Sequence, residues 1–259
     1  MNIKILMSTM NKQNIEELKL KEKNISNCII INQIKEPMEK LEKSDAILYS
    51  YNEKGLAKSR NRLLEKVETD VDVGIITDDD VIFVKNYRNI VQKAYEEMKD
   101  ADIIIFKSLD EDGKDRRKYP LQNKKLTKKE ILQVCSIEIT FKISKIKDKV
   151  WFDEKFGLGS KYKSGEENIF LQDCYNKGVK IYFYNEAINA HPKESTGTIW
   201  KEEDIYEKGA LFKRLYPKIC FLMVLPIAVL KNNICKTSVL NTTKLLLKGM
   251  RDYKKEESK

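Results

Sequence analysis

Three consecutive carboxylates, Asp78, Asp79 and Asp80, follow directly on an apolar run at residues 73–77. Two unit charges about 4 Å apart repel by about 4 kcal/mol at an effective dielectric of about 20. The chain has no Lys or Arg from residue 71 to residue 84 that would relieve this repulsion locally. A cation from outside the segment is therefore expected. Carboxylate oxygens suit hard divalent ions such as Mg²⁺ or Mn²⁺, which keep positions open for phosphate oxygens.

A polar turn or a helix cap would be the simpler explanation of an isolated Asp pair. Here the apolar residues 81–83 follow the cluster at once, and the amphipathic helix expected downstream begins only near Asn86. The three carboxylates are therefore expected at the carboxyl end of a buried strand.

Short apolar runs alternate with helical patterns through the first half of the chain, which is typical of βαβ units. Apolar residues at helical spacing predict helices between residues 56 and 67 and between residues 87 and 98. The sequence predicts an α/β fold with a Rossmann-like, mostly parallel central sheet flanked by helices and followed by a C-terminal helical extension. The expected strands are Ile3–Met7, Cys28–Asn32, Ala46–Ser50, Val73–Thr77 and Asp102–Lys107.

The pattern of apolar and charged residues changes after a charged turn at residues 110–115. Alternating apolar residues at 134–143 indicate an antiparallel or mixed edge region. Gly165 precedes an expected helix that ends near Asn176, and a strand is expected at Val179–Tyr184. Glu166 and Glu167 open that helix. Acidic residues in a first turn commonly do no more than complement the helix dipole.

The net charge of +9 is concentrated in the last fifth of the chain. Residues 208–259 contain 12 basic and 3 acidic side chains, so this tail accounts for the whole excess and residues 1–207 are balanced. A general nucleic-acid-binding groove on the main domain is not expected, and no nucleic-acid-binding module is recognisable.

The tail has two apolar segments. Ile219–Leu230 carries no charge and is interrupted by Pro226; as a helix it would be about 18 Å long, short of the roughly 30 Å of a bilayer core. Thr243–Tyr253 reads as a basic amphipathic helix of the interfacial kind. Two alternatives stay open for 208–259: contact with an anionic membrane surface, or helices packing on the main domain.

Five scattered cysteines without CxxC spacing favour a reduced, cytoplasmic compartment. Their spacing does not predict a zinc site. The amino terminus reads as a first strand and not as a secretory signal.

Taken together, several segments resemble glycosyltransferase family 2 over roughly residues 1–195, and their order and spacing are more specific than any one of them. They are Ser8-Thr9-Met10-Asn11, a Gly-x-Ala-x-x-Arg-Asn helix at 55–61, the Asp cluster at 78–80, Phe152-Asp153-Glu154-Lys155-Phe156, Gly165-Glu166-Glu167 and His191-Pro192. The resemblance implies an A-type, inverting, nucleotide-sugar-dependent enzyme.

The resemblance also implies roles for these residues. A divalent ion, Mn²⁺ or Mg²⁺, would be held by Asp80 or Asp79, with His191 near the metal and diphosphate, and would stabilise the charge on the leaving diphosphate. Glu167 stands where the family usually has Asp and would be the general base, with Glu166 as the alternative.

The donor side is implied to include Ser8, Thr9 and Asn11 after the first strand, together with Asp78 and Asp79. Arg60 could reach the diphosphate, or could simply lie on a solvated helix face. Many relatives end the second strand with Asp residues that recognise uracil and ribose, whereas this chain has Asn32 there, which can still pair with a base edge.

The function expected is transfer of a sugar from a nucleotide donor, a UDP-sugar first, to a saccharide or lipid-linked acceptor in surface polysaccharide or glycolipid biosynthesis. Residues 1–207 would form the catalytic domain, with a donor half at 1–110 and an acceptor half at 111–207. The protein would be cytoplasmic and peripheral on the inner face of the membrane. The alternatives are another nucleotide-sugar enzyme, such as a nucleotidyltransferase, and a non-catalytic scaffold on the same fold.

Overall fold

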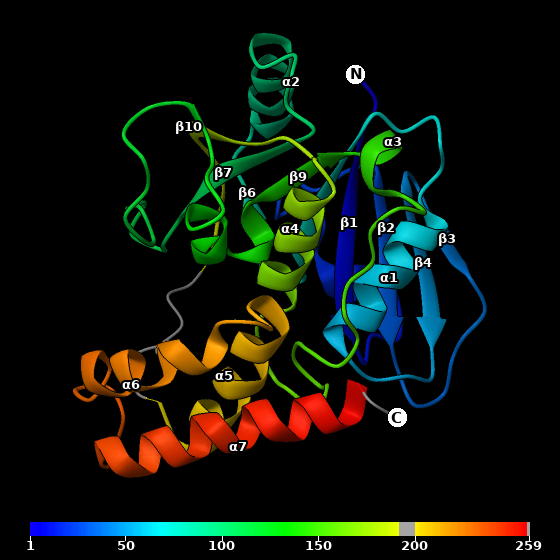
Figure 1. The fold of residues 1–259 in the computed structure, drawn as a ribbon. Coiled ribbons are helices and arrows are strands. Elements are labelled where there is room, and N and C mark those ends of the chain that lie inside the picture. The colour runs from blue at the N-terminus through cyan, green and yellow to red at the C-terminus, as the bar shows by residue number, and fades with distance from the viewer. Residues whose placement is uncertain (192–199, 258–259) are drawn as a thin grey trace. The chain divides into compact units, whose positions relative to one another are not determined.

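The computed structural model describes residues 1–191 and 200–257 (Figure 1). These residues divide into two compact units. The first comprises Met1–Glu154 and the chain from Glu166 through the last strand; the second comprises Lys155–Gly165 and the C-terminal helices. The boundary expected at residue 207 falls inside helix α5 (Glu202–Leu215), so the helical unit begins earlier than residue 208.

The first unit is built on one mixed sheet of ten strands. Its core is the parallel set β4-β2-β1-β5, and a second parallel pair joins β7 to β10. Every residue of β2 is buried, as expected for a central parallel strand covered on both faces. The strands are β1 (Ile3–Met10), β2 (Cys28–Gln33), β3 (Leu41–Lys43), β4 (Ala46–Tyr51), β5 (Val73–Asp78), β6 (Ile82–Phe83), β7 (Ile103–Leu109), β8 (Lys124–Lys125), β9 (Ile139–Lys142) and β10 (Ile181–Ala190).

Helices cover both faces of this sheet and complete two apolar cores. Val91 and Ala94 of α2 pack in the core on one face, whereas Leu63 of α1 and Phe170 of α4 pack in the core on the other. The first unit's helices are α1 (Leu56–Lys66), α2 (Tyr87–Glu97), α3 (Ile143–Ile146) and α4 (Glu166–Asn176), with short 3₁₀ turns at η1 (Glu16–Leu18), η2 (Glu130–Gln133) and η3 (Ser136–Glu138).

The six strands and three helices expected in this unit are all present, with ends shifted by up to six residues. One expectation was wrong. The alternating segment at 134–143 was assigned to an edge, but β9 lies between β5 and β7 and pairs antiparallel with both. The reason is that Ile139, Thr140 and Phe141 are fully buried, and residues of this kind suit an interior position.

The start of α1 is fixed by a neutral amide contact. The Gln33 side chain donates to the Gly55 carbonyl at 3.0 Å and accepts from the Gly55 N–H at 3.1 Å. Gly55 has φ of 128°, a conformation in which other residues are strained. The end of β2 therefore sets where α1 begins.

The second unit contains three helices, α5 (Glu202–Leu215), α6 (Cys220–Leu230) and α7 (Val239–Glu257). The segment Lys155–Gly165 also belongs to this unit. α5 and α7 approach each other through glycines: a Cβ on Gly209 would stand 2.2 Å from the Leu246 carbonyl oxygen, and one on Gly249 would stand 2.0 Å from that of Tyr206. Among the described residues, no helix is long and apolar enough to cross a membrane.

Candidate functional site

The candidate site lies at the carboxyl ends of β1 and β5. The chain places β2 and β4 on one side of β1 and β5 on the other, so the order of strands reverses at β1. Crevices at such a reversal are where open α/β sheets bind ligands. Ser8 of β1 pairs in register with Asp78 of β5, which brings the expected donor segment beside the Asp cluster.

Each carboxylate of the cluster has a different partner. Arg60 Nη2 lies 3.4 Å from Asp78 Oδ1, and His191 Nε2 lies 3.0 Å from Asp80 Oδ2. Asp79 Oδ2 accepts a hydrogen bond from Thr9 at 2.6 Å and lies 3.2 Å from the Lys12 ammonium. Cationic side chains from distant parts of the sequence therefore lie beside the cluster, and a bound metal ion stays a prediction.

These partners separate the proton affinities of the cluster. Burial raises the pKa of Asp78, and the nearby Arg60 opposes that rise. The hydrogen bond from His191 lowers the pKa of Asp80, whose side chain is 59% exposed. Asp80 is therefore the member of the cluster that combines a negative charge with access to solvent.

Arg60 is the link between the cluster and helix α4. Its side chain is 1% exposed, and Nη1 lies 2.7 Å from Glu166 Oε1 while Nη2 reaches Asp78. Its guanidinium also lies over the Phe152 ring, 5.6 Å from the ring centroid. The alternative that placed Arg60 on a solvated helix face is excluded by this burial. One guanidinium joins the carboxylate at the end of β5 to a carboxylate at the start of α4, as its rigid fork allows.

The neighbouring Asn61 fixes a second long-range connection. Its side chain accepts from the Phe152 N–H at 2.8 Å, donates to the Phe152 carbonyl at 3.0 Å, and donates to Glu154 Oε1 at 3.0 Å. The Phe152 ring stacks on that of Phe170 in α4, with centroids 4.2 Å apart. Arg60 thus contacts the start of α4 directly through Glu166, and Asn61 contacts α4 indirectly through Phe152.

The two carboxylates that open α4 differ in environment. Glu166 is 5% exposed and is occupied by Arg60, whereas Glu167 is partly exposed. Burial, together with the negative charge of Glu166, raises the pKa of Glu167 to about 8. A carboxylate with such a pKa is suited to accepting a proton near neutral pH. Of the two expected candidates, Glu167 is the one whose side chain is partly exposed.

The expected donor residues Ser8 and Asn32, near the ends of β1 and β2, are hydrogen-bonded to neighbouring residues. Ser59 of α1 donates to the Ser8 hydroxyl at 2.8 Å. The fully buried Asn32 side chain donates to the Lys12 carbonyl at 2.8 Å and accepts from the Lys12 N–H at 3.1 Å. Asn11 is exposed, with φ of 55°. Asn32 therefore holds the loop that carries Lys12 in this structure.

A divalent ion can be tested against this arrangement. Across residues 1–191 and 200–257, no group of three or more His, Cys, Asp or Glu side chains is arranged for a metal. Asp80 and His191 are adjacent and together supply one oxygen and one nitrogen. Mg²⁺ sites of nucleotide enzymes commonly use one or two carboxylates and take the rest from phosphates and water. Asp80 is compatible with such an ion, whereas His191 Nε2 would have to give up its hydrogen bond to Asp80 before it could bind one. Pro192, the second residue of the expected His-Pro pair, lies outside the described residues.

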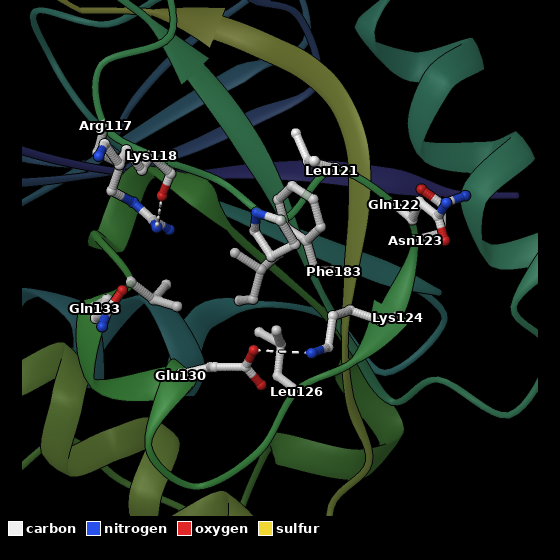
Figure 2. A pocket seen from close by; sticks show the side chains of 13 residues that line it. Arg117, Lys118, Leu121, Gln122, Asn123, Lys124, Leu126, Glu130, Gln133 and Phe183 are labelled. Atoms are coloured by element: carbon white, nitrogen blue, oxygen red, sulfur yellow. Dashed lines mark hydrogen bonds and ion pairs between the residues drawn. The ribbon is translucent and has the colours of Figure 1, made fainter.

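A cavity of about 700 Å³ lies beside the start of α4 in the first unit. Figure 2 shows Arg117, Lys124 and Glu130 around it, with Phe183 and Leu126 on its apolar side. The wall that contains Gln133 is tied to α4, because the Asn168 amide donates to the Leu132 carbonyl at 3.3 Å. The residue after Glu167 thus contacts the wall of this cavity.

Sequence reasoning missed several residues of the site. Lys12 and Lys23 reach Asp79, the first through its carboxylate and the second through its backbone carbonyl. Asn61 was noted only as part of a motif. The motif itself was the available signal for Asn61, whereas nothing in the local pattern distinguishes Lys12 or Lys23 from other lysines.

Comparison with known proteins gives a consistent result for the fold. No protein-family model matches the chain, and no curated protein matches it in sequence. Solved structures do match: Staphylococcus aureus TarS 1-349 aligns with 100% of this chain and 73% of its own, at 13% identity and a TM-score of 0.58. The same protein in complex with UDP-GlcNAc aligns with 96% of this chain and 72% of its own, at 16% identity and a TM-score of 0.59.

A longer TarS structure aligns with 98% of this chain and 43% of its own, at 16% identity and a TM-score of 0.58. Identities this low establish the fold alone. The expected fold class is confirmed: an α/β sheet with a parallel core flanked by helices, of the A-type glycosyltransferase kind, followed by a C-terminal helical extension.

Proposed function

We propose that this protein is a metal-dependent inverting glycosyltransferase that transfers a sugar from a nucleoside diphosphate, first of all UDP, to a hydroxyl of a saccharide or lipid-linked acceptor. The observation that carries the proposal is the buried Arg60 that holds Asp78 and Glu166 together. It puts an acidic cluster suited to a metal and diphosphate near a carboxylate suited to accepting a proton.

The donor would lie across the ends of β1 and β5. Asp80 and His191 would hold Mn²⁺ or Mg²⁺ there, and the ion would supply positive charge to the leaving diphosphate. Thr9 and Lys12 keep Asp79 in place beside it. The likeness to TarS, which has been solved with UDP-GlcNAc and with UDP, supports a uridine nucleotide as the first donor to test.

The acceptor would lie on the α4 side. Glu167 takes the proton from the acceptor hydroxyl, whose oxygen forms a bond to the anomeric carbon as the bond from that carbon to the diphosphate oxygen breaks. With a pKa of about 8, the Glu167 carboxylate is a stronger base than an ordinary carboxylate, and the fraction of it that is deprotonated and able to act grows as the pH rises toward 8. The cavity lined by Arg117 and Phe183 offers polar groups and an apolar wall, as saccharide sites do, and we assign it to the acceptor.

The experiment is a donor panel of nucleotide sugars incubated with the full chain, with and without Mn²⁺, in which released nucleoside diphosphate is measured. Release from one donor that requires the metal is expected, and E167Q and D80N should both remove it. D112N, in the exposed charged turn, is the matched carboxylate control and should retain it.

Two results would count against the proposal. A chain that binds UDP with metal but gives the same trace turnover with E167Q as without it would be a binding protein on this fold. Formation of a nucleotide sugar and pyrophosphate from a sugar phosphate and a nucleoside triphosphate would identify a nucleotidyltransferase. The anomeric configuration of any product, read by NMR, tests inversion.

A further inference from the structure

Helix α6 exposes an unusual amount of apolar surface. Leu222 is 63% exposed, Leu225 is 60% exposed and Leu230 is 77% exposed. Cys220, Val224 and Ala228, which follow one another at four-residue spacing, form its buried side. A helix that is apolar on all sides is normally buried on all sides. Here about half of its circumference faces outward without a partner in the described chain.

Helix α7 exposes fewer large apolar side chains than α6: only Leu240, 65% exposed, and Leu247, 44% exposed, stand out among its described residues. Leu246 is fully buried, Met250 is 6% exposed and Tyr253 is 1% exposed. The apolar side of the segment expected to lie at a membrane interface is thus used within the second unit, where the glycine contacts bring α7 against α5. Among the described helices of this unit, α6 therefore exposes the most large apolar side chains.

The charge around α6 indicates what that contact is. No acidic residue occurs from Lys208 to Arg251, a stretch that contains nine Lys and Arg side chains. Lys218 and Lys231 bracket the apolar residues directly. A second copy of the chain would bring the same cations against these, and like charges oppose association. An anionic lipid surface has the complementary charge and can accept apolar side chains of any outline.

We infer that α6 is a monotopic membrane-binding element that lies in the headgroup region of an anionic bilayer, with Phe221, Leu222, Leu225 and Leu230 inserted and the flanking lysines at the phosphates. Its 11 residues would extend about 16 Å, so it lies in the interface and does not cross it. The inference goes beyond transferase activity and does not depend on it.

The test uses the full chain and sedimentation with vesicles of phosphatidylcholine alone or with about 30% phosphatidylglycerol. Binding is expected to the anionic vesicles and to weaken with salt. L222E/L225E should lower the partition coefficient at least about tenfold, because two charges replace inserted side chains. L158E is the matched control: Leu158 is 67% exposed in the same unit but outside α6, and this variant should bind as the parent does.

A second measurement does not depend on a destabilising pair of charges. F221W places a fluorophore on α6, and its emission should shift to the blue with anionic vesicles and be quenched by lipids brominated near the headgroup. Unchanged emission on bound vesicles, or full binding by L222E/L225E, would overturn the inference. A chain that is dimeric in solution, becomes monomeric as L222E/L225E and ignores vesicles would show that a second copy covers α6 instead.

Discussion

Replacing Arg60 by Met should destabilise the protein more than removing any exposed cation. At an effective dielectric of about 20, the 2.7 Å contact with Glu166 corresponds to about 6 kcal/mol of attraction and the 3.4 Å contact with Asp78 to about 5 kcal/mol, both offset by the desolvation of the charges. The net change is better taken from broken buried ion pairs, which cost about 3–5 kcal/mol because a buried charge is left unpaired. We expect R60M to lower the free energy of unfolding at pH 7 by an amount within that range.

The change should also depend on pH in a definite direction. Without the guanidinium, protonation neutralises the buried carboxylates, so the difference in free energy of unfolding between R60M and the parent should shrink as the pH is lowered. Urea denaturation followed by circular dichroism at several pH values measures this difference. R60K, which keeps the charge but lacks the fork, should fall between the two and provides the measurement if R60M does not fold.

The matched control is R62M on the same helix. Arg62 is 38% exposed and lies 2.9 Å from Glu65 and 3.2 Å from Glu53, so its loss should cost no more than about 1 kcal/mol. If R60M costs no more than R62M, or if its cost does not change with pH, then Arg60 does not neutralise these carboxylates and the linking role assigned to it is refuted.

Three further predictions concern other parts of the molecule. If Glu167 is the base, transferase activity should rise with pH up to about 8, since the carboxyl must lose its proton to act, and the pH profile of kcat/KM should show this limb; a flat profile from pH 6 to 9 would exclude it. N61A removes three hydrogen bonds to Phe152 and Glu154 and should lower the free energy of unfolding by about 1–3 kcal/mol in urea titrations, whereas a neutral effect would show that stacking alone holds this segment. G209V would place side-chain atoms inside the 2.2 Å contact with Leu246 and should cost at least about 1–3 kcal/mol, seen as a lower Tm; an unchanged Tm would mean that α5 and α7 separate without cost.

Local pattern was enough for the fold because each central strand is marked by its own residues. The run Cys28–Gln33 is apolar and β-branched along most of its length, and this is sufficient to predict a strand covered on both faces. β9 was misplaced for a complementary reason. Alternation specifies a strand, but which strands flank it depends on pairing with β5 and β7, far away in sequence.

The sequence predicted which residues belong to the candidate site but not which of their side chains contact one another. The motifs contain the Asp cluster, Arg60 and the α4 carboxylates, but the sequence left the place of Arg60 open and did not predict that it contacts both Asp78 and Glu166. Residues 71–84 contain no Lys or Arg that could neutralise the cluster. The partners of Asp79 and Asp80 are Lys12 and His191, which lie far away in the sequence. Contacts between residues so far apart in the sequence produce no periodic pattern from which they could be predicted. The roles proposed for these residues in catalysis stay predictions.

Helix α1 is held near its start by the neutral Gln33 amide and one turn later by the charged Arg60. These two attachments answer differently to the solvent. Acid removes the negative charge from the partners of Arg60 but leaves an amide contact unchanged. Progressive acidification should therefore release the contacts of Arg60 with Asp78 and Glu166 first, while the register between β2 and α1 survives.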